Sequence, residues 1–94
     1  MDVYSEIVKR IIKQQETIIG PVAIEQAEHI PGLDVNWAKQ QVSIKGDGAK
    51  VIDDLVGQYK ELFGKISVEV CKEAAEQLVT KLNSDNLKVP KTLS

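Results

Sequence analysis

The chain has 94 residues, enough for one domain with a single small core. Its net charge of −2 argues against a nucleic-acid-binding protein, in which a basic face is expected. A single cysteine, Cys71, excludes an internal disulfide, and no apolar run reaches the length of a membrane span.

Residues 3–19 are predicted to form the first helix, with Asp2 as its N-cap. Gly20-Pro21 then ends this helix and starts a second one over residues 21–30. Pro31-Gly32 stops the second helix. The first helix is amphipathic, since its apolar residues recur at helical spacing: Tyr4, Ile7, Val8, Ile11, Ile12, Ile18 and Ile19.

Residues 33–45 have two interpretations. Leu33 and Val35, then Val42 and Ile44, alternate with polar residues, which predicts a small β-hairpin with its turn near residues 36–39. In the alternative, Asp34 caps a short helix. Residues 21–43 would then resemble a helix-turn-helix with a wing, as in winged-helix DNA-binding proteins, and Asn36, Lys39, Gln40 and Gln41 would face the bases. The Val42-Ser43-Ile44 alternation favours the hairpin.

Residues 49–82 have helical periodicity almost throughout, after a Gly46-Asp47-Gly48 turn in which Asp47 is the expected N-cap. One straight helix of this length would measure about 50 Å, whereas a domain of this size is about 30–35 Å across. We therefore expect a break near Gly64, giving helices over residues 48–63 and 66–82.

The overall prediction is an α+β fold that is mainly helical, with two helix–Gly–helix pairs joined by the hairpin. Residues 1–86 are expected to form the compact domain, and residues 87–94 a tail that either lies extended across the body or is mobile. A shift of 44 residues aligns 7–30 with 51–74 and places Gly20 on Gly64. This alignment suggests an internal duplication, although two amphipathic helices in phase share much of the same pattern.

Candidate catalytic groups are few. His29 is the only histidine, and no cluster of histidine, cysteine and carboxylate residues marks a metal site, so no metal and no cofactor is predicted. Asp53 and Asp54 are adjacent and point to different sides of a helix, which is unsuited to an acid/base pair. No catalytic residue is predicted, and an enzyme is the least favoured function.

The Gly46–Gly48 turn faintly resembles a phosphate-binding turn. Backbone N–H groups at a helix start attract anions, and Lys50 adds positive charge beside them. However, Asp47 would compete for the same N–H groups as a cap. The turn also lacks the third glycine of a dinucleotide-binding motif and the lysine of a P-loop.

The favoured function is a small, non-enzymatic protein-interaction or regulatory module in the cytoplasm that self-associates. Apolar residues around 18–24 and 66–71 spread beyond the stripe that a four-helix domain buries, which predicts a homodimer whose interface includes Ile24 or Val68. The competing interpretation is that residues 87–93 fold back and cover the same surface within one chain. Trp37, near the hairpin tip, is either a further interface residue or a cover for the core. The alternatives are a small-ligand or anion-binding domain with a pocket between the helix pairs, and the winged-helix DNA-binding protein.

Overall fold

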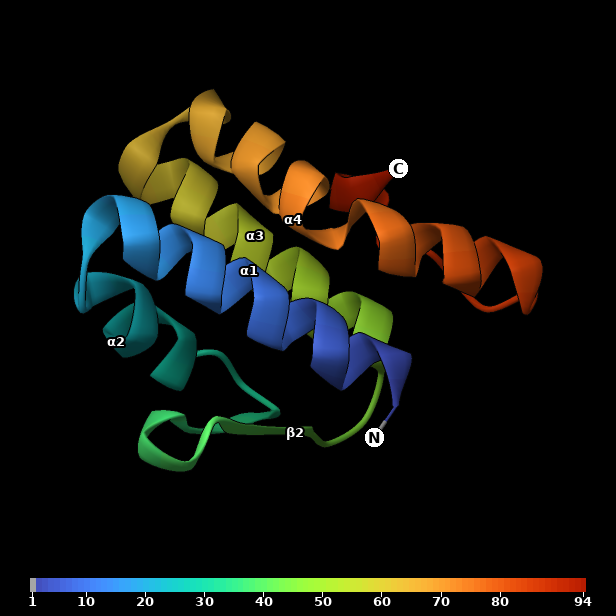
Figure 1. Ribbon diagram of the computed structural model, residues 1–94, viewed down its shortest axis with the longest axis horizontal. Helices are drawn as coiled ribbons and strands as arrows, with labels where there is room; N and C mark the ends of the chain where they lie inside the picture. Colours follow the sequence, from blue (N-terminus) through green and yellow to red (C-terminus); the bar gives the residue numbers. More distant parts are fainter. Residues whose placement is uncertain (1) are drawn as a thin grey trace.

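The computed structural model describes residues 2–94, which form four α-helices and one antiparallel β-hairpin (Figure 1). The predicted α+β, mainly helical fold is confirmed, with the hairpin between the second and third helices. The elements in chain order are α1 (Val3–Ile19), α2 (Val22–Glu28), β1 (Leu33–Asn36), the 3-10 helix η1 (Trp37–Lys39), β2 (Gln41–Ile44), α3 (Gly48–Phe63), α4 (Lys65–Ser84) and the 3-10 helix η2 (Lys91–Leu93).

The helices α1 and α3 run in the same direction, and α4 returns across both of them (Figure 1). The helix α2 and the hairpin lie on the other side of α1 from α4. The core therefore lies between α1, α3 and α4, and α2 and the hairpin close its remaining side. No helix in residues 2–94 is both long enough and apolar enough to cross a membrane.

Two glycines end the first and third helices. Gly20 has φ of 76° and Gly64 has φ of 83°, a region that favours glycine. Each donates its N–H to the carbonyl four residues back, on Glu16 and Lys60 respectively. The predicted break at Gly64 is thus confirmed, and it keeps the longest dimension of the molecule at 33 Å. The similar backbone at the two positions is compatible with a duplication, which stays a prediction.

The start of α1 is capped as expected. The Asp2 carboxylate accepts hydrogen bonds from the Ser5 N–H and the Ser5 hydroxyl, both at 2.9 Å. Partial burial disfavours the charged carboxylate, but the hydrogen bonds from Ser5 outweigh it and hold the pKa of Asp2 below its usual value.

The hairpin has the predicted strands. Leu33 pairs with Ile44, and Val35 with Val42, so these four apolar residues share the face that packs on the core. The polar partners, among them Asp34 and Ser43, point outward. The helix-turn-helix alternative required a helix in this stretch, and only the single 3-10 turn η1 is present within it.

The core is aliphatic and contains one buried aromatic residue, Tyr59. Its hydroxyl donates to the Ala23 carbonyl at 2.6 Å and so ties α3 to α2. Burial raises the pKa of this phenol well above its usual value. The most deeply buried apolar residues from the three long helices are Ile7, Val8, Ile11, Ile12, Ile52, Leu55, Val56, Cys71, Ala75 and Leu82.

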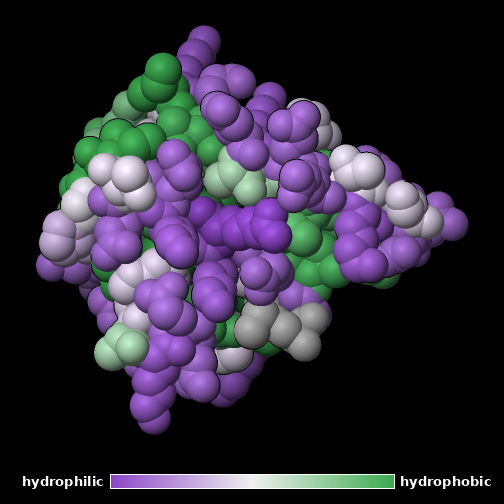
Figure 2. All heavy atoms as spheres, viewed as in Figure 1, coloured by the Kyte–Doolittle hydropathy of each residue, from purple (hydrophilic) through white to green (hydrophobic). Residues whose placement is uncertain are grey.

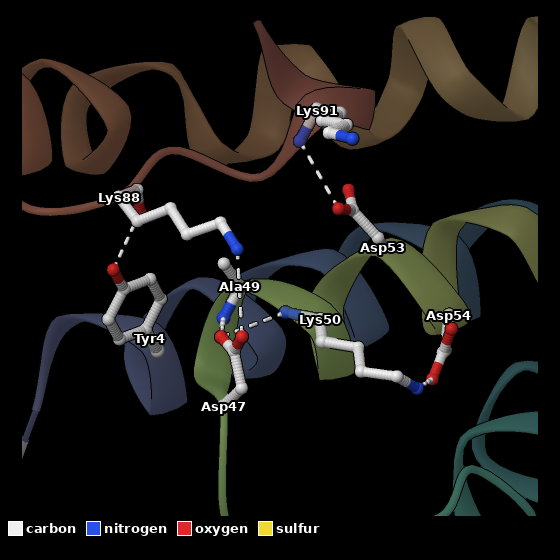
Figure 3. A network of polar contacts seen from close by, with 8 residues as sticks. All are labelled: Tyr4, Asp47, Ala49, Lys50, Asp53, Asp54, Lys88 and Lys91. Atoms are coloured by element: carbon white, nitrogen blue, oxygen red, sulfur yellow. Dashed lines mark hydrogen bonds and ion pairs between the residues drawn. The ribbon is translucent and has the colours of Figure 1, made fainter.

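The C-terminal residues lie across α3 and α4, which is one of the two courses that the sequence left open for them. Pro90 and Leu93 are buried. The Lys88 carbonyl accepts a hydrogen bond from the Tyr4 hydroxyl at 2.6 Å (Figure 3). The Lys91 N–H donates to the Asp53 carboxylate at 3.3 Å, so the segment is held at both of its ends.

Candidate interaction surface

Large apolar side chains are exposed together at one end of the molecule. Ile18 is 57% exposed, Leu62 is 49% exposed and Ile66 is 72% exposed. They come from the end of α1, the end of α3 and the start of α4, and these three helix ends meet beside Gly20 and Gly64 (Figure 1). Figure 2 shows apolar atoms gathered at this end, at the upper left, where α4 begins. We call Ile18, Leu62 and Ile66 the apolar patch.

The helix breaks explain why these residues are left uncovered. Each lies within two residues of Gly20 or Gly64, where its helix ends or begins. A side chain in the last or first turn has fewer neighbouring helices to pack against than one in the middle. The patch is therefore a consequence of where the two glycines stop the helices.

A groove between α1 and α4 continues from the patch. One part, of about 420 Å³, is lined by Gln14, Ile18, Val70, Glu73 and Ala74. The adjoining part shares Gln14 and Ala74, has a volume of about 240 Å³, and is otherwise lined by Arg10, Lys13 and Thr17. Residues 66, 70 and 74 follow one another at one-turn intervals, so Ile66 of the patch and the groove lie on one face of α4.

A buried side chain fixes the spacing of α1 and α4 beneath this surface. The Gln15 amide Nε2 donates to the Ser67 carbonyl at 3.1 Å and to the Cys71 Sγ at 3.4 Å. Gln15 is 1% exposed, so these bonds are shielded from water. Burial raises the pKa of the Cys71 thiol to about 11, which leaves it protonated and unreactive at neutral pH.

Trp37 takes the covering position of its two predicted alternatives. It starts η1 at the hairpin tip, is half-buried and packs against the core. Its indole N–H donates to the Glu16 carboxylate on α1 at 3.2 Å. Because Trp37 is only half-buried, its contact with a partner stays a prediction.

Ile24 and Val68, the residues predicted for the dimer interface, lie on α2 and α4. Both are half-buried and pack against the core. Neither is among the large apolar residues that are exposed, which in the described part of the chain are the three residues of the patch and Leu87. The segments around residues 18–24 and 66–71 that the sequence analysis singled out do include Ile18 and Ile66. The feature that would have identified these two as the exposed residues is their position beside a helix-ending glycine.

In the turn that was predicted as an anion site, the backbone N–H groups already donate to the carboxylate of Asp47 in the same turn. Asp47 accepts hydrogen bonds from the N–H groups of Ala49 at 3.0 Å and Lys50 at 3.3 Å (Figure 3). The Lys50 ammonium is paired with Asp54 at 2.9 Å. The Lys50 N–H and the nearby Lys88 ammonium hold the pKa of Asp47 below its usual value, so the carboxylate is charged at neutral pH.

The two glycines of this turn have structural explanations. Gly46 has φ of 89°, which favours glycine. A Cβ on Gly48 would lie 2.6 Å from the Tyr4 ring, so the ring packs directly on the start of α3. Neither glycine therefore requires a ligand to account for it.

His29 is exposed and follows the last residue of α2. In residues 2–94, no three histidine, cysteine or carboxylate side chains come together in a way that could hold a metal ion.

Asp53 has a role that the sequence analysis missed. Besides the Lys91 N–H, its carboxylate accepts hydrogen bonds from the Thr92 N–H at 2.9 Å and the Thr92 hydroxyl at 2.7 Å. Asp53 is thus the residue of α3 that holds the C-terminal residues through hydrogen bonds. No signal in the sequence marks this contact, because its partners are 38 and 39 residues away.

Comparison with known proteins adds no relative: no protein-family model, no curated protein and no solved structure matches the chain. The class that the fold and surface define is a small α+β domain with an exposed apolar patch and an adjoining groove.

Proposed function

We propose that this protein is a non-enzymatic interaction module that self-associates through the apolar patch. The observation that carries the proposal is that Ile18, Leu62 and Ile66, which lie at three neighbouring helix ends, are exposed in a small domain whose other large apolar residues are mostly buried or half-buried. Contiguous apolar surface on a soluble domain is characteristic of an interaction site. A homodimer is the commonest arrangement in which such a surface is covered by an identical one.

A cytoplasmic location is part of the proposal. The one cysteine is unpaired and buried in the core, where it serves as a small apolar residue. A domain of this size that depends on its aliphatic core rather than on disulfides suits a reducing compartment.

The size of the patch sets what else the interface needs. Burying the exposed part of one such side chain contributes on the order of 1 kcal/mol, hence about 6 kcal/mol for the three residues on each of two copies. Association costs about 4–15 kcal/mol in lost motional freedom. The patch alone therefore lies near the lower limit, and a stable dimer must also use surface beside it.

The test is the solution mass of the chain by size-exclusion chromatography with light scattering. We expect wild-type protein to show twice the mass of one chain and Ile66→Lys to show the mass of one chain, since Ile66 is the most exposed residue of the patch. Leu87→Lys is the matched control, because Leu87 is a large apolar residue that is 46% exposed but lies after α4. A wild-type chain that stays monomeric at about 0.5 mM would overturn the proposal.

A further inference from the structure

The α1–α4 groove carries opposite charges on its two walls. Arg10 and Lys13 lie on the α1 side, and Glu73 lies on the α4 side. All three are exposed, and none takes part in an ion pair within 4.0 Å among the described residues. The rest of the lining consists of the apolar Ile18, Val70 and Ala74 and the polar Gln14 and Thr17. The groove therefore has basic residues on its α1 side, an acidic residue on its α4 side, and a lining in which three apolar side chains accompany two polar ones.

This layout restricts what the groove can accept. A partner segment of a single charge sign would meet one of the two walls with like charge, which is unfavourable. A partner that presents acidic and basic groups on opposite sides of an apolar strip satisfies both walls. A second copy of the same surface meets this description.

Resting on the proposed self-association, we infer that the groove seats a second copy of this chain through a twofold axis. In this arrangement α1 of each copy packs against α4 of the other, and Ile66 at the end of the groove joins the buried surface. Arg10 and Lys13 of one copy then face Glu73 of the other, and the symmetry repeats the contact. Packing α1 against α1 would instead place Arg10 and Lys13 against the same residues of the partner.

The arrangement makes a prediction that only a reciprocal interface satisfies. In the double variant Arg10→Glu/Lys13→Glu, each α1 wall of the homodimer meets the unchanged Glu73, and in Glu73→Lys each α4 wall meets the unchanged Arg10 and Lys13. Both homodimers therefore contain like-charge contacts. In an equimolar mixture the altered walls meet each other, and the unaltered walls meet each other, so opposite charges face across both contacts.

The experiment measures the dimer dissociation constant of each variant, and of the mixture, by sedimentation equilibrium. We expect each variant alone to dissociate about tenfold or more readily than wild type, and the mixture to form a heterodimer close to wild-type affinity. Lys39→Glu and Glu28→Lys are matched controls, since both residues are exposed and lie outside the groove. Circular dichroism confirms that all variants fold.

The outcomes separate this inference from the function on which it rests. If the wild-type protein dimerises and both groove variants have the same dissociation constant as wild type, the twofold packing in the groove is wrong. Self-association itself then stands. If both variants dimerise more weakly than wild type but their mixture does not regain affinity, the twofold packing in the groove is also wrong. A wild-type monomer at every concentration would overturn both.

Discussion

At Gly64 the backbone conformation, and not the available space, is what favours glycine. The position has φ of 83°, and a Cβ placed there would meet no atom within 4 Å. Gly57, in the middle of α3, is equally open but has no such φ. Comparing alanine substitutions at the two positions therefore measures the effect of backbone strain without any effect of crowding.

We predict that Gly64→Ala lowers the free energy of unfolding by about 1 kcal/mol, because a side chain is strained in this backbone region. Gly57→Ala should raise it by up to about 1 kcal/mol, since alanine is the better helix former. Urea titration of both variants measures the difference. A Gly64→Ala protein as stable as wild type would mean that α3 and α4 do not need this bend.

Ionisation of the Cys71 thiol should lower the free energy of unfolding at alkaline pH. Its pKa is raised from 9.0 to about 11, so the native state favours the neutral thiol. The corresponding stability is complete below pH 9 and is lost as the pH rises to about 11. From this residue alone we expect a loss of about 1 kcal/mol at pH 10.

Urea titrations of wild type and Cys71→Ala at pH 8 and pH 10 check this prediction. The buried Tyr59 phenol, whose pKa is raised by burial and by the nearby Cys71, adds its own loss of stability from pH 10 upward, so the comparison is made at pH 10 and not above it. If the two proteins lose equal stability between these pH values, the thiol is not shielded as described.

Among the elements, the C-terminal segment depends most on a single side chain. The Asp53 carboxylate accepts three hydrogen bonds from Lys91 and Thr92, whereas its neighbour Asp54 forms only an exposed ion pair with Lys50. Asp53→Ala should therefore lower the free energy of unfolding by about 1–3 kcal/mol, and Asp54→Ala by about 0.5 kcal/mol or less.

Amide hydrogen exchange measures the effect of the same two substitutions on the C-terminal segment itself. The Thr92 N–H should exchange faster in Asp53→Ala and at the wild-type rate in Asp54→Ala, because only Asp53 accepts from it. Unchanged exchange at Thr92 in Asp53→Ala would show that the burial of Pro90 and Leu93 holds the segment without this carboxylate.

The elements themselves could be predicted because their signals are local. Helical periodicity identified α1, α3 and α4, and the two glycines marked where helices end. The alternation in residues 33–44 identified the hairpin. For residues 88–93 the sequence left open whether they lie across the body, and it could not predict where they dock, since Pro90 and Leu93 become buried only against helices that precede them by many residues.

At the scale of the whole molecule, the apolar patch also lay beyond sequence reasoning. An excess of apolar residues near Ile18 and Ile66 was visible, but which of them stay exposed depends on how three helix ends meet. The periodicity argument selected Ile24 and Val68, which pack partly on the core. Leu62 follows the buried Leu55 and Tyr59 at helical spacing, yet it is 49% exposed in the last turn of α3.

The central claim is that the patch is covered by a second copy, and methyl NMR of a dilution series tests it most directly. The resonances of Ile18 and Ile66 should shift as the protein is diluted and the dimer dissociates, whereas those of the buried Ile7 and of the exposed Leu87 should stay in place. Methyl resonances at Ile18 and Ile66 that do not move across the whole concentration range would contradict the account.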